Sequence, residues 1–239
     1  MPRMRFSRIL LKLSGEALSG GEEQFCHARL TALARAIADA AAGGVQMGIV
    51  IGAGNIFRAR SANLEVIDRV TADHVGMLAT VMNAAVLGSY LRAAGVKARV
   101  VSPRPVPPLS EEFAPVPARA LLDSGHVLLC GGGTGNPFFT TDSAAALRAV
   151  ELGAEVLLKA TQVDGVYDKD PRRHPDARRF DRLTYDEVIA RRLGVMDLTA
   201  VTLCAEQDLP IVVFDVSQPE NLGRVLTGEL QGTCIAKEI

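Results

Sequence analysis

The chain has 239 residues, of which 48% are hydrophobic and 22% are charged, a composition typical of a globular rather than a disordered protein. Lys and Arg number 26 against 27 Asp and Glu, and the net charge of -1 excludes a generally basic protein that coats nucleic acid. Aromatic residues make up 5% with no Trp, so base stacking on aromatic platforms is not expected, and we predict no nucleic-acid partner.

Short apolar runs alternate along the chain with longer Ala-rich helical patterns. Strands are predicted at 8–13, 45–51, 97–101, 126–130, 155–159 and 211–214, and helices at 27–42, 69–94, 117–124, 142–152, 184–192 and 198–207. Several of the strands are apolar almost throughout, as expected when both faces of a sheet are covered. The alternation predicts a mostly parallel, doubly wound α/β sheet.

Two segments interrupt this alternation. Residues 102–117 are rich in proline and are predicted to form a loop or a rigid excursion on the surface. Residues 164–182 contain the turn signals Asp164-Gly165 and Asp170-Pro171, followed by a basic stretch that nearby acids dilute. We interpret the second segment as a solvated loop.

The N-terminal apolar stretch ends at Lys12, so no signal peptide is predicted. No apolar run approaches the roughly 20 residues that cross a bilayer, so no membrane partner is expected. The cysteines Cys26, Cys130, Cys204 and Cys234 form no C-x-x-C pair and are predicted to be buried thiols, with two disulfides as the alternative. These features favour a cytoplasmic protein.

The carboxyl ends of parallel strands share one edge of a sheet, where ligands bind. The predicted strands are followed there by 12–16 (KLSGE), 52–55 (GAGN), 131–137 (GGGTGNP) and 159–161 (KAT). Glycine turns expose backbone N–H groups that bind anions, and Lys12 and Lys159 add two charges able to reach a phosphate. Tight packing explains any one such turn, but several turns with two lysines favour a phosphate site.

Known phosphate- and dinucleotide-binding motifs show which kinds of nucleotide site this chain does not contain. The chain has no G-x-x-x-x-G-K-[ST] motif, and Phe57 stands where Gly52-x-Gly54 would need a third glycine, which argues against an NAD-dependent oxidoreductase. The most distinctive segment is 134–142 (TGNPFFTTD), whose hydroxyls suit a phosphate and whose phenylalanines suit a sugar or base. Anchoring of the loop is the alternative for the rings, and Asp142 is predicted to cap the following helix.

Five segments occur in the order seen in one family: 9–17 (ILLKLSGEA), 51–58 (IGAGNIFR), 73–83 (DHVGMLATVMN), 134–143 (TGNPFFTTDS) and 158–166 (LKATQVDGV). From about residue 8 to 233 the chain resembles the bacterial-type uridylate (UMP) kinases of the amino-acid-kinase superfamily. The resemblance implies a three-layer αβα sandwich around an open, mostly parallel sheet. It also implies phosphoryl transfer from ATP to UMP with Mg²⁺ in pyrimidine nucleotide biosynthesis, a homohexamer, activation by GTP and inhibition by UTP.

The resemblance also implies a single domain over 1–239. Within it, residues of about 1–150 would bind the acceptor and residues of about 151–239 would bind ATP. Lys12 would bridge the transferring phosphoryl group, Lys159 would assist from the ATP side, and Asp142 would orient both lysines and the metal-phosphate cluster. No protein metal site is expected, because the nucleotide phosphates would hold most of the Mg²⁺. The implied ATP-binding residues are Lys12, Leu13, Ser14, Gly15, Gly54, Arg58, Thr161, Tyr167 and Asp170. The implied UMP-binding residues are Ala53, Asp73, Thr134, Gly135, Asn136, Pro137, Phe138, Phe139, Thr140 and Thr141, with a helix cap as the alternative for Asp73.

The chain departs from the family pattern at Ala53 and Ala59, where the family has glycine, and over 60–66, 103–117 and 19–28. Two alternatives therefore remain open. The first is another kinase of the superfamily that acts on a carboxylate, which the TGNPFFTT loop disfavours. The second is a non-catalytic nucleotide-binding relative for regulation or storage, which the retained Lys12, Lys159 and Asp142 disfavour.

Overall fold

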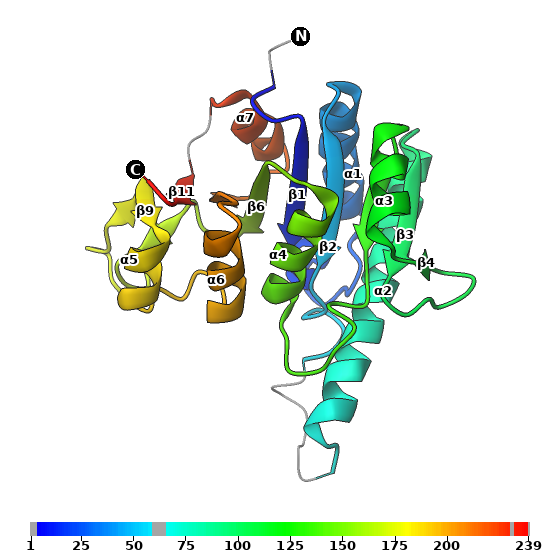
Figure 1. The fold of residues 1–239 in the computed structure, drawn as a ribbon, viewed down its shortest axis with the longest axis horizontal. Coiled ribbons are helices and arrows are strands. Elements are labelled where there is room, and N and C mark those ends of the chain that lie inside the picture. Colours follow the sequence, from blue (N-terminus) through cyan, green and yellow to red (C-terminus); the bar gives the residue numbers. More distant parts are fainter. Residues whose placement is uncertain (1–3, 59–65, 230–231, 239) are drawn as a thin grey trace.

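The computed structural model describes residues 4–58, 66–229 and 232–238, and its centre is a nine-stranded sheet (Figure 1). The strands are β1 (Arg8–Leu13), β2 (Gln46–Ile51), β3 (Ala98–Ser102), β4 (Glu111–Glu112), β5 (Val127–Cys130), β6 (Val156–Thr161), β9 (Arg182–Thr184), β10 (Ile211–Asp215) and β11 (Thr233–Ala236). Their order is β4-β3-β5-β2-β1-β6-β10-β11-β9, and the pairing is parallel except between β10 and β11. The predicted mostly parallel sheet is confirmed.

Helices cover both faces of the sheet. One face carries α1 (His27–Ala42), α2 (Arg69–Ala93) and α7 (Asn221–Thr227), and the other carries α3 (Pro115–Asp123), α4 (Thr141–Leu152), α5 (Tyr185–Ala190) and α6 (Leu198–Glu206). Figure 1 shows α4 and α6 side by side in front of the sheet. It also shows α2 extending beyond the lower ends of the strands. These layers form the expected αβα sandwich.

The central strands are apolar because their side chains alternate between two buried layers. On β1, Ile9, Leu11 and Leu13 enter the core under α1 and α7, whereas Leu10 enters the core under α4. On β6, Leu158 likewise faces the first of these cores. The same alternation sends every second position of β1 and β6 toward α4, including the two lysines discussed below.

The structure also contains short elements that the apolar pattern does not reveal. The Pro-rich segment includes β4 at one sheet edge, and α3 begins at Pro115, two residues before the predicted start, because proline suits the first turn of a helix. Residues 164–182 were predicted as a loop but contain the antiparallel hairpin of β7 (Val166–Tyr167) and β8 (Arg179–Phe180). Ala59 and residues 60–65 lie outside the described residues.

Two details bear on the compartment. By length and composition alone, α2 is apolar enough to span a membrane, with a mean hydropathy of 1.3, although no such run was predicted. It packs against α1 and β3, 39% of the apolar stretch is buried, and a single helix of this kind is weak evidence of a membrane span. All four cysteines are free, and burial raises the pKa of the Cys130 and Cys204 thiols to about 12 in each case, so both remain protonated packing groups.

Candidate active site

Two lysines lie side by side at the centre of the sheet. Lys12 on β1 and Lys159 on β6 are register partners of the parallel pair, so their Cα atoms stand at the same level of the sheet. Because Leu11 and Leu158 point into the core under α1, the lysine one position further along each strand points to the opposite face. That face is covered by α4, whose first turn lies above both ammonium groups.

Asp142 in the first turn of α4 joins the two lysines. Its Oδ1 lies 2.9 Å from Lys12 Nζ, an ion pair outside hydrogen-bond geometry, and its Oδ2 accepts a hydrogen bond from Lys159 Nζ at 2.8 Å. The side chains are only 12%, 12% and 16% exposed for Lys12, Lys159 and Asp142. Both ammonium groups therefore lie in a weakly solvated place, where a positive charge attracts a phosphate strongly.

The electrostatics of this cluster follow from its burial. Burial alone would raise the pKa of Asp142, but the nearby Lys12 and Lys159 outweigh that cost and lower the pKa below its usual 3.8. Burial lowers the pKa of Lys159 below its usual 10.5, and repulsion from Lys12 adds to this, while Asp142 opposes it. The carboxyl is therefore ionised at neutral pH and holds the lysines together.

The start of α4 is fixed by Thr140, not by Asp142 as predicted. The Thr140 hydroxyl caps the helix by accepting the N–H groups of Asp142 at 3.0 Å and Ser143 at 3.4 Å. Asp142 occupies the second position of the helix, so the prediction that it caps α4 is wrong. Its carboxylate is free for the lysines because a neighbour satisfies the backbone.

Asp197 is a residue of this centre that the sequence did not reveal. It caps α6 by accepting the Ala200 N–H at 2.9 Å, and it also accepts the Ser143 hydroxyl at 3.0 Å and the Thr140 hydroxyl. It therefore ties the start of α4 to the start of α6. An Asp ahead of the apolar helical pattern at 198–207 signals a cap, but only the packing of the two helices connects that cap with the lysines.

A first cavity of about 490 Å³ opens on one side of the cluster. Its walls come from the end of β1, the loop after β2, the first turns of α2 and the loop before α4. The lining residues are Lys12, Glu16, Ala53, Gly54, Phe57, Arg58, Arg69, Asp73, Gly76, Met77, Thr80, Gly133, Thr134, Asn136, Phe139, Thr140, Thr141 and Asp142. Most of the predicted acceptor residues are thus brought together, and so are Gly54 and Arg58, which had been predicted for ATP.

Asp73 connects α2 to the loop before α4. Its Oδ2 accepts the Phe138 N–H at 2.8 Å, and both carboxylate oxygens accept from Arg69 Nε at 2.9 Å. The helix-cap alternative for Asp73 does not hold, because Asp68 caps α2 by accepting the Thr71 N–H at 3.0 Å. Phe138 has φ of 72° and is 65% exposed, with its ring near the Arg69 guanidinium.

Three of the predicted acceptor residues do not line the first cavity: Gly135, Pro137 and Phe138. Gly135 instead lines a small apolar cavity of about 130 Å³ behind the loop, together with Met77, Leu78 and Val81. Phe139 does reach the first cavity and is 49% exposed. The Phe139 ring therefore forms part of the wall of the first cavity, whereas the Phe138 ring is exposed to solvent.

The loops after β1 and β2 pack directly on each other. A Cβ on Gly15 would lie 2.8 Å from the Gly54 N atom, and a Cβ on Gly54 would collide with the Glu16 carboxylate. Glycine is thus needed at position 15, where a side chain would meet backbone, whereas the contact at Gly54 is with a flexible side chain. Leu13, Ser14 and Gly15, predicted for ATP, line neither large cavity.

Two further contacts shape the loop after β2. Arg58 forms an ion pair with Glu16 and donates from Nε to the Gly54 carbonyl at 3.1 Å. The buried Asn83 of α2 donates to the Gly52 carbonyl at 2.7 Å. Among the described non-glycine residues, positive φ occurs at Phe138, Arg192 and Asp208, so alanine at position 53 carries no left-handed backbone strain.

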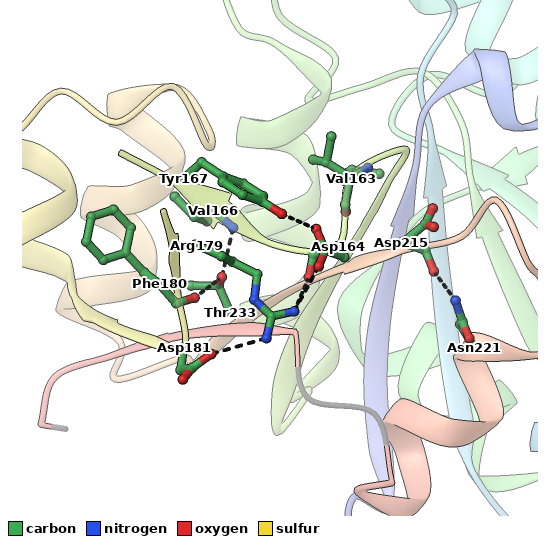
Figure 2. Close-up of polar contacts among 11 residues, drawn as sticks. Val163, Asp164, Val166, Tyr167, Arg179, Phe180, Asp181, Asp215, Asn221 and Thr233 are labelled. Atoms are coloured by element: carbon green, nitrogen blue, oxygen red, sulfur yellow. Dashed lines mark hydrogen bonds and ion pairs between the residues drawn. The ribbon is translucent and has the colours of Figure 1, made fainter. Parts of the chain in front are cut away.

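A second cavity of about 480 Å³ opens on the other side of the cluster. Its lining residues are Lys159, Thr161, Val163, Gly165, Val166, Tyr167, Asp168, Lys169, Asp170, Pro171, Arg191, Arg192, Leu193, Gly194, Val195 and Val213. The predicted ATP residues Thr161, Tyr167 and Asp170 therefore meet here beside Lys159. The Tyr167 hydroxyl donates to Asp164 at 2.7 Å (Figure 2), and Lys159 Nζ donates to the Val195 carbonyl.

The protein offers few ligands for a metal ion. The part of the chain that the structure describes contains no group of three or more His, Cys, Asp or Glu side chains placed to hold one. Asp142 is the carboxylate between the two lysines and lines the first cavity. A divalent cation at this centre would take most of its oxygen ligands from phosphate groups and water, as Mg²⁺ commonly does.

The comparisons with known proteins cover nearly the whole chain. Residues 7–215 match the model of the Amino acid kinase family. The chain is 48% identical over 236 residues to a uridylate kinase of Legionella pneumophila (strain Lens), covering 98% of this chain and 95% of the relative. It is 49% identical over 232 residues to a uridylate kinase of Porphyromonas gingivalis, covering 97% of each.

Solved structures give the same result. The crystal structure of a UMP kinase from Bacillus anthracis superimposes with a TM-score of 0.94 at 36% identity and covers 98% of this chain and 97% of that one. A UMP kinase from Ureaplasma parvum superimposes with a TM-score of 0.92 at 33% identity, covering 98% and 100%. The superpositions thus cover nearly the whole chain.

Proposed function

The chain belongs to the amino acid kinase family and, within it, to the uridylate kinases, and from that membership we propose that it transfers the γ-phosphoryl group of ATP to UMP, giving UDP and ADP. The observation that carries the proposal is the Lys12–Asp142–Lys159 cluster between two cavities of nucleotide size. A positive centre with a pocket on either side suits transfer of an anionic group from one ligand to another.

We place UMP in the first cavity and ATP in the second. Asp73, Thr134 and Phe139 line the first, which supports an acceptor side within about 1–150, and Thr161 and Tyr167 line the second, which supports an ATP side within about 151–239. This arrangement changes one prediction drawn from the resemblance. Gly54 and Arg58 lie in the first cavity, so the Arg58 guanidinium is assigned to the acceptor's phosphate instead of the phosphates of ATP.

The proposed mechanism needs little covalent chemistry from the protein. The phosphate of UMP is already nucleophilic, so the protein must align it with ATP and stabilise the charge on the transferring group. Lys12 contacts that group at the junction of the cavities, Lys159 supports it from the ATP side, and Asp142 holds both lysines in place. Asp142 is the carboxylate that would lie nearest a Mg²⁺ ion brought in with the ATP phosphates, and such an ion would neutralise further phosphate charge.

A coupled ADP-release assay tests this function. Mg-ATP is offered separately with UMP, CMP, dUMP, acetylglutamate and aspartate, and release that depends on UMP is expected. Release with acetylglutamate or aspartate instead would favour a carboxylate kinase of the same superfamily. Silence with every acceptor, together with measurable nucleotide binding, would favour a non-catalytic relative.

The resemblance supports further proposals about context. We place the reaction in pyrimidine nucleotide biosynthesis in the cytoplasm, in a homohexamer activated by GTP and inhibited by UTP. Exposed apolar side chains on α2 support self-association, namely Val75, Leu78 and Met82, which are 41%, 50% and 44% exposed. Their spacing of three and four residues puts them on one face of the helix.

A further inference from the structure

The wall of the ATP-side cavity includes a hairpin that is too short to be stable by itself. Each of its strands, β7 and β8, has two residues, and Val166 pairs with Phe180 in register. Isolated two-stranded ribbons are marginal in water even when longer. Tyr167 and Val166 line the cavity from this hairpin, so the shape of that wall depends on what holds the hairpin in place.

A single buried hydroxyl from β11 bridges both strands of this hairpin. Thr233 Oγ1 accepts the Val166 N–H at 2.7 Å and donates to the Phe180 carbonyl, as Figure 2 shows. The two bonded residues are the register partners of the hairpin, so the hydroxyl joins the strands at their one apolar pair. Thr233 is 0% exposed, and water cannot replace either bond without local opening.

The residues around Thr233 leave room for its hydroxyl to reach the hairpin. A Cβ on Gly165 would lie 2.5 Å from the Thr233 hydroxyl and 2.9 Å from Arg179 Cδ, so the hydroxyl rests against bare backbone. On the other side, Thr233 pairs with Val213 of β10, and Val213 itself lines the ATP-side cavity. Thr233 therefore links the two walls of the cavity, contacting the hairpin through its hydroxyl and the sheet through its strand pairing with Val213.

Other polar contacts of the hairpin are exposed. Arg179 contacts Asp164 at 3.0 Å and Asp181 at 3.2 Å, and these carboxylates are 55% and 79% exposed. Ion pairs of this kind contribute little, because water and salt compete with them. The buried Thr233 bonds are the ones expected to fix the hairpin.

We propose that Thr233 is a positioning residue for ATP, acting through Val166 and Tyr167 without touching the nucleotide. The inference rests on the proposed function, because it takes the second cavity as the ATP site. Thr233, 67 positions after Val166 in the sequence, thereby contributes to nucleotide binding by holding the hairpin in place.

The test compares Thr233→Val, which keeps the shape and removes the hydroxyl, with Thr233→Ser, which keeps the hydroxyl. Thr233→Val is expected to raise KM for ATP about tenfold while KM for UMP changes less than about twofold, since loss of buried bonds loosens one cavity only. Thr233→Ser is expected to restore KM for ATP. Asp181→Asn, which removes an exposed contact of the same hairpin, serves as the matched control and is expected to leave both constants unchanged.

Equal increases in both KM values, or an unchanged KM for ATP, would overturn the proposal, since a general loss of stability does not distinguish the two substrates. Should Thr233→Val fail to fold, Thr233→Ala provides the second variant, because it removes the same hydroxyl without changing a residue that lines the cavity. Calorimetric titration with a non-hydrolysable ATP analogue measures nucleotide binding without turnover, so it tests the role of Thr233 separately from the proposed reaction. Weaker binding by Thr233→Val in a protein that does not phosphorylate UMP would support the positioning role while refuting the proposed activity.

Discussion

Two partly buried lysines that share one carboxylate are the central arrangement of this molecule. Adjacent like charges repel, and burial adds a cost for each, so the pair would be unfavourable without Asp142 between the ammonium groups. Lys12 also lines the first cavity, where its ammonium group can meet a phosphate. A phosphate in that cavity would lie against a preorganised charge, which connects the electrostatics of the cluster with phosphoryl transfer.

Replacement of Lys12 by alanine is the simplest test at the scale of one residue. Lys12→Ala removes a preorganised charge at the transferring group, and kcat is expected to fall by roughly 10²–10³. Lys97→Ala, at an exposed lysine remote from both cavities, is the matched control and should keep the wild-type kcat. Steady-state kinetics with saturating ATP and UMP measure both, and a near-normal kcat for Lys12→Ala would refute its role.

Asp142→Asn leaves both lysines without their counter-charge and is expected to lower the free energy of unfolding by about 3 kcal/mol at neutral pH. The pKa of Asp142 in the folded protein lies below its ordinary 3.8, so its stabilisation is complete above that value and is lost as the pH falls through the folded pKa. The difference from wild type should therefore narrow below about pH 4.

Urea unfolding of both proteins between pH 7 and pH 3 measures this difference in unfolding free energy. Asp176→Asn, which breaks an exposed pair with Lys169 at 2.6 Å, is expected to change stability by less than about 1 kcal/mol at any of these pH values. A gap between wild type and Asp142→Asn that stays constant across the range would show that the carboxylate does not stabilise the lysines.

At the scale of one element, α4 delivers Asp142 to the lysines because its first turn is fixed by Thr140. Both Thr140→Ala and Thr184→Ala remove a threonine cap, from α4 and α5 respectively, and each is expected to cost about 1 kcal/mol of stability. Only Thr140→Ala should also lower kcat, about tenfold, because a frayed α4 misplaces Asp142. Thermal unfolding and kcat measured together decide this, and an equal effect of both variants on kcat would contradict it.

The longer helices and strands could be predicted from the sequence, because their buried faces give apolar residues a regular spacing. The strand at 8–13 and the helix at 27–42 have the predicted bounds, since each is long enough to show its period. The order of strands also placed Lys12 and Lys159 at one edge of the sheet. Their register, which sets them side by side, required the structure.

Other features could not be predicted because they depend on contacts between distant segments. Strands of two residues, such as β7 and β8, have no period to detect. The run Thr140-Thr141-Asp142 contains three good caps in a row, and sequence alone does not choose between them. The link from Asp197 to α4 and the placement of Arg58 in the first cavity likewise arise from packing.

At the scale of the whole molecule, the chain builds one side of the sheet and then the other. Starting from β1 it adds β2, β3 and β5 on one side, and afterwards β6 and β10 on the opposite side. The order of strands therefore reverses between β1 and β6, and crevices at such switch points are where open α/β sheets bind ligands. Each half supplies one cavity, and the two lysines stand on the strands that meet at the switch.

Self-association is the prediction that belongs to the whole molecule. One end of α2 extends past the sheet (Figure 1). Leu78 and Met82 are exposed on one face of this helix, so their burial requires another surface. Wild type is expected to have the mass of a hexamer by light scattering, and Leu78→Glu combined with Met82→Glu should give smaller species, because charge in an apolar contact is costly. Val116→Glu on α3, at a residue 70% exposed, is the matched control and should keep the wild-type mass. A monomeric wild type, or an unchanged mass in the double variant, would show that this face of α2 does not hold an assembly together.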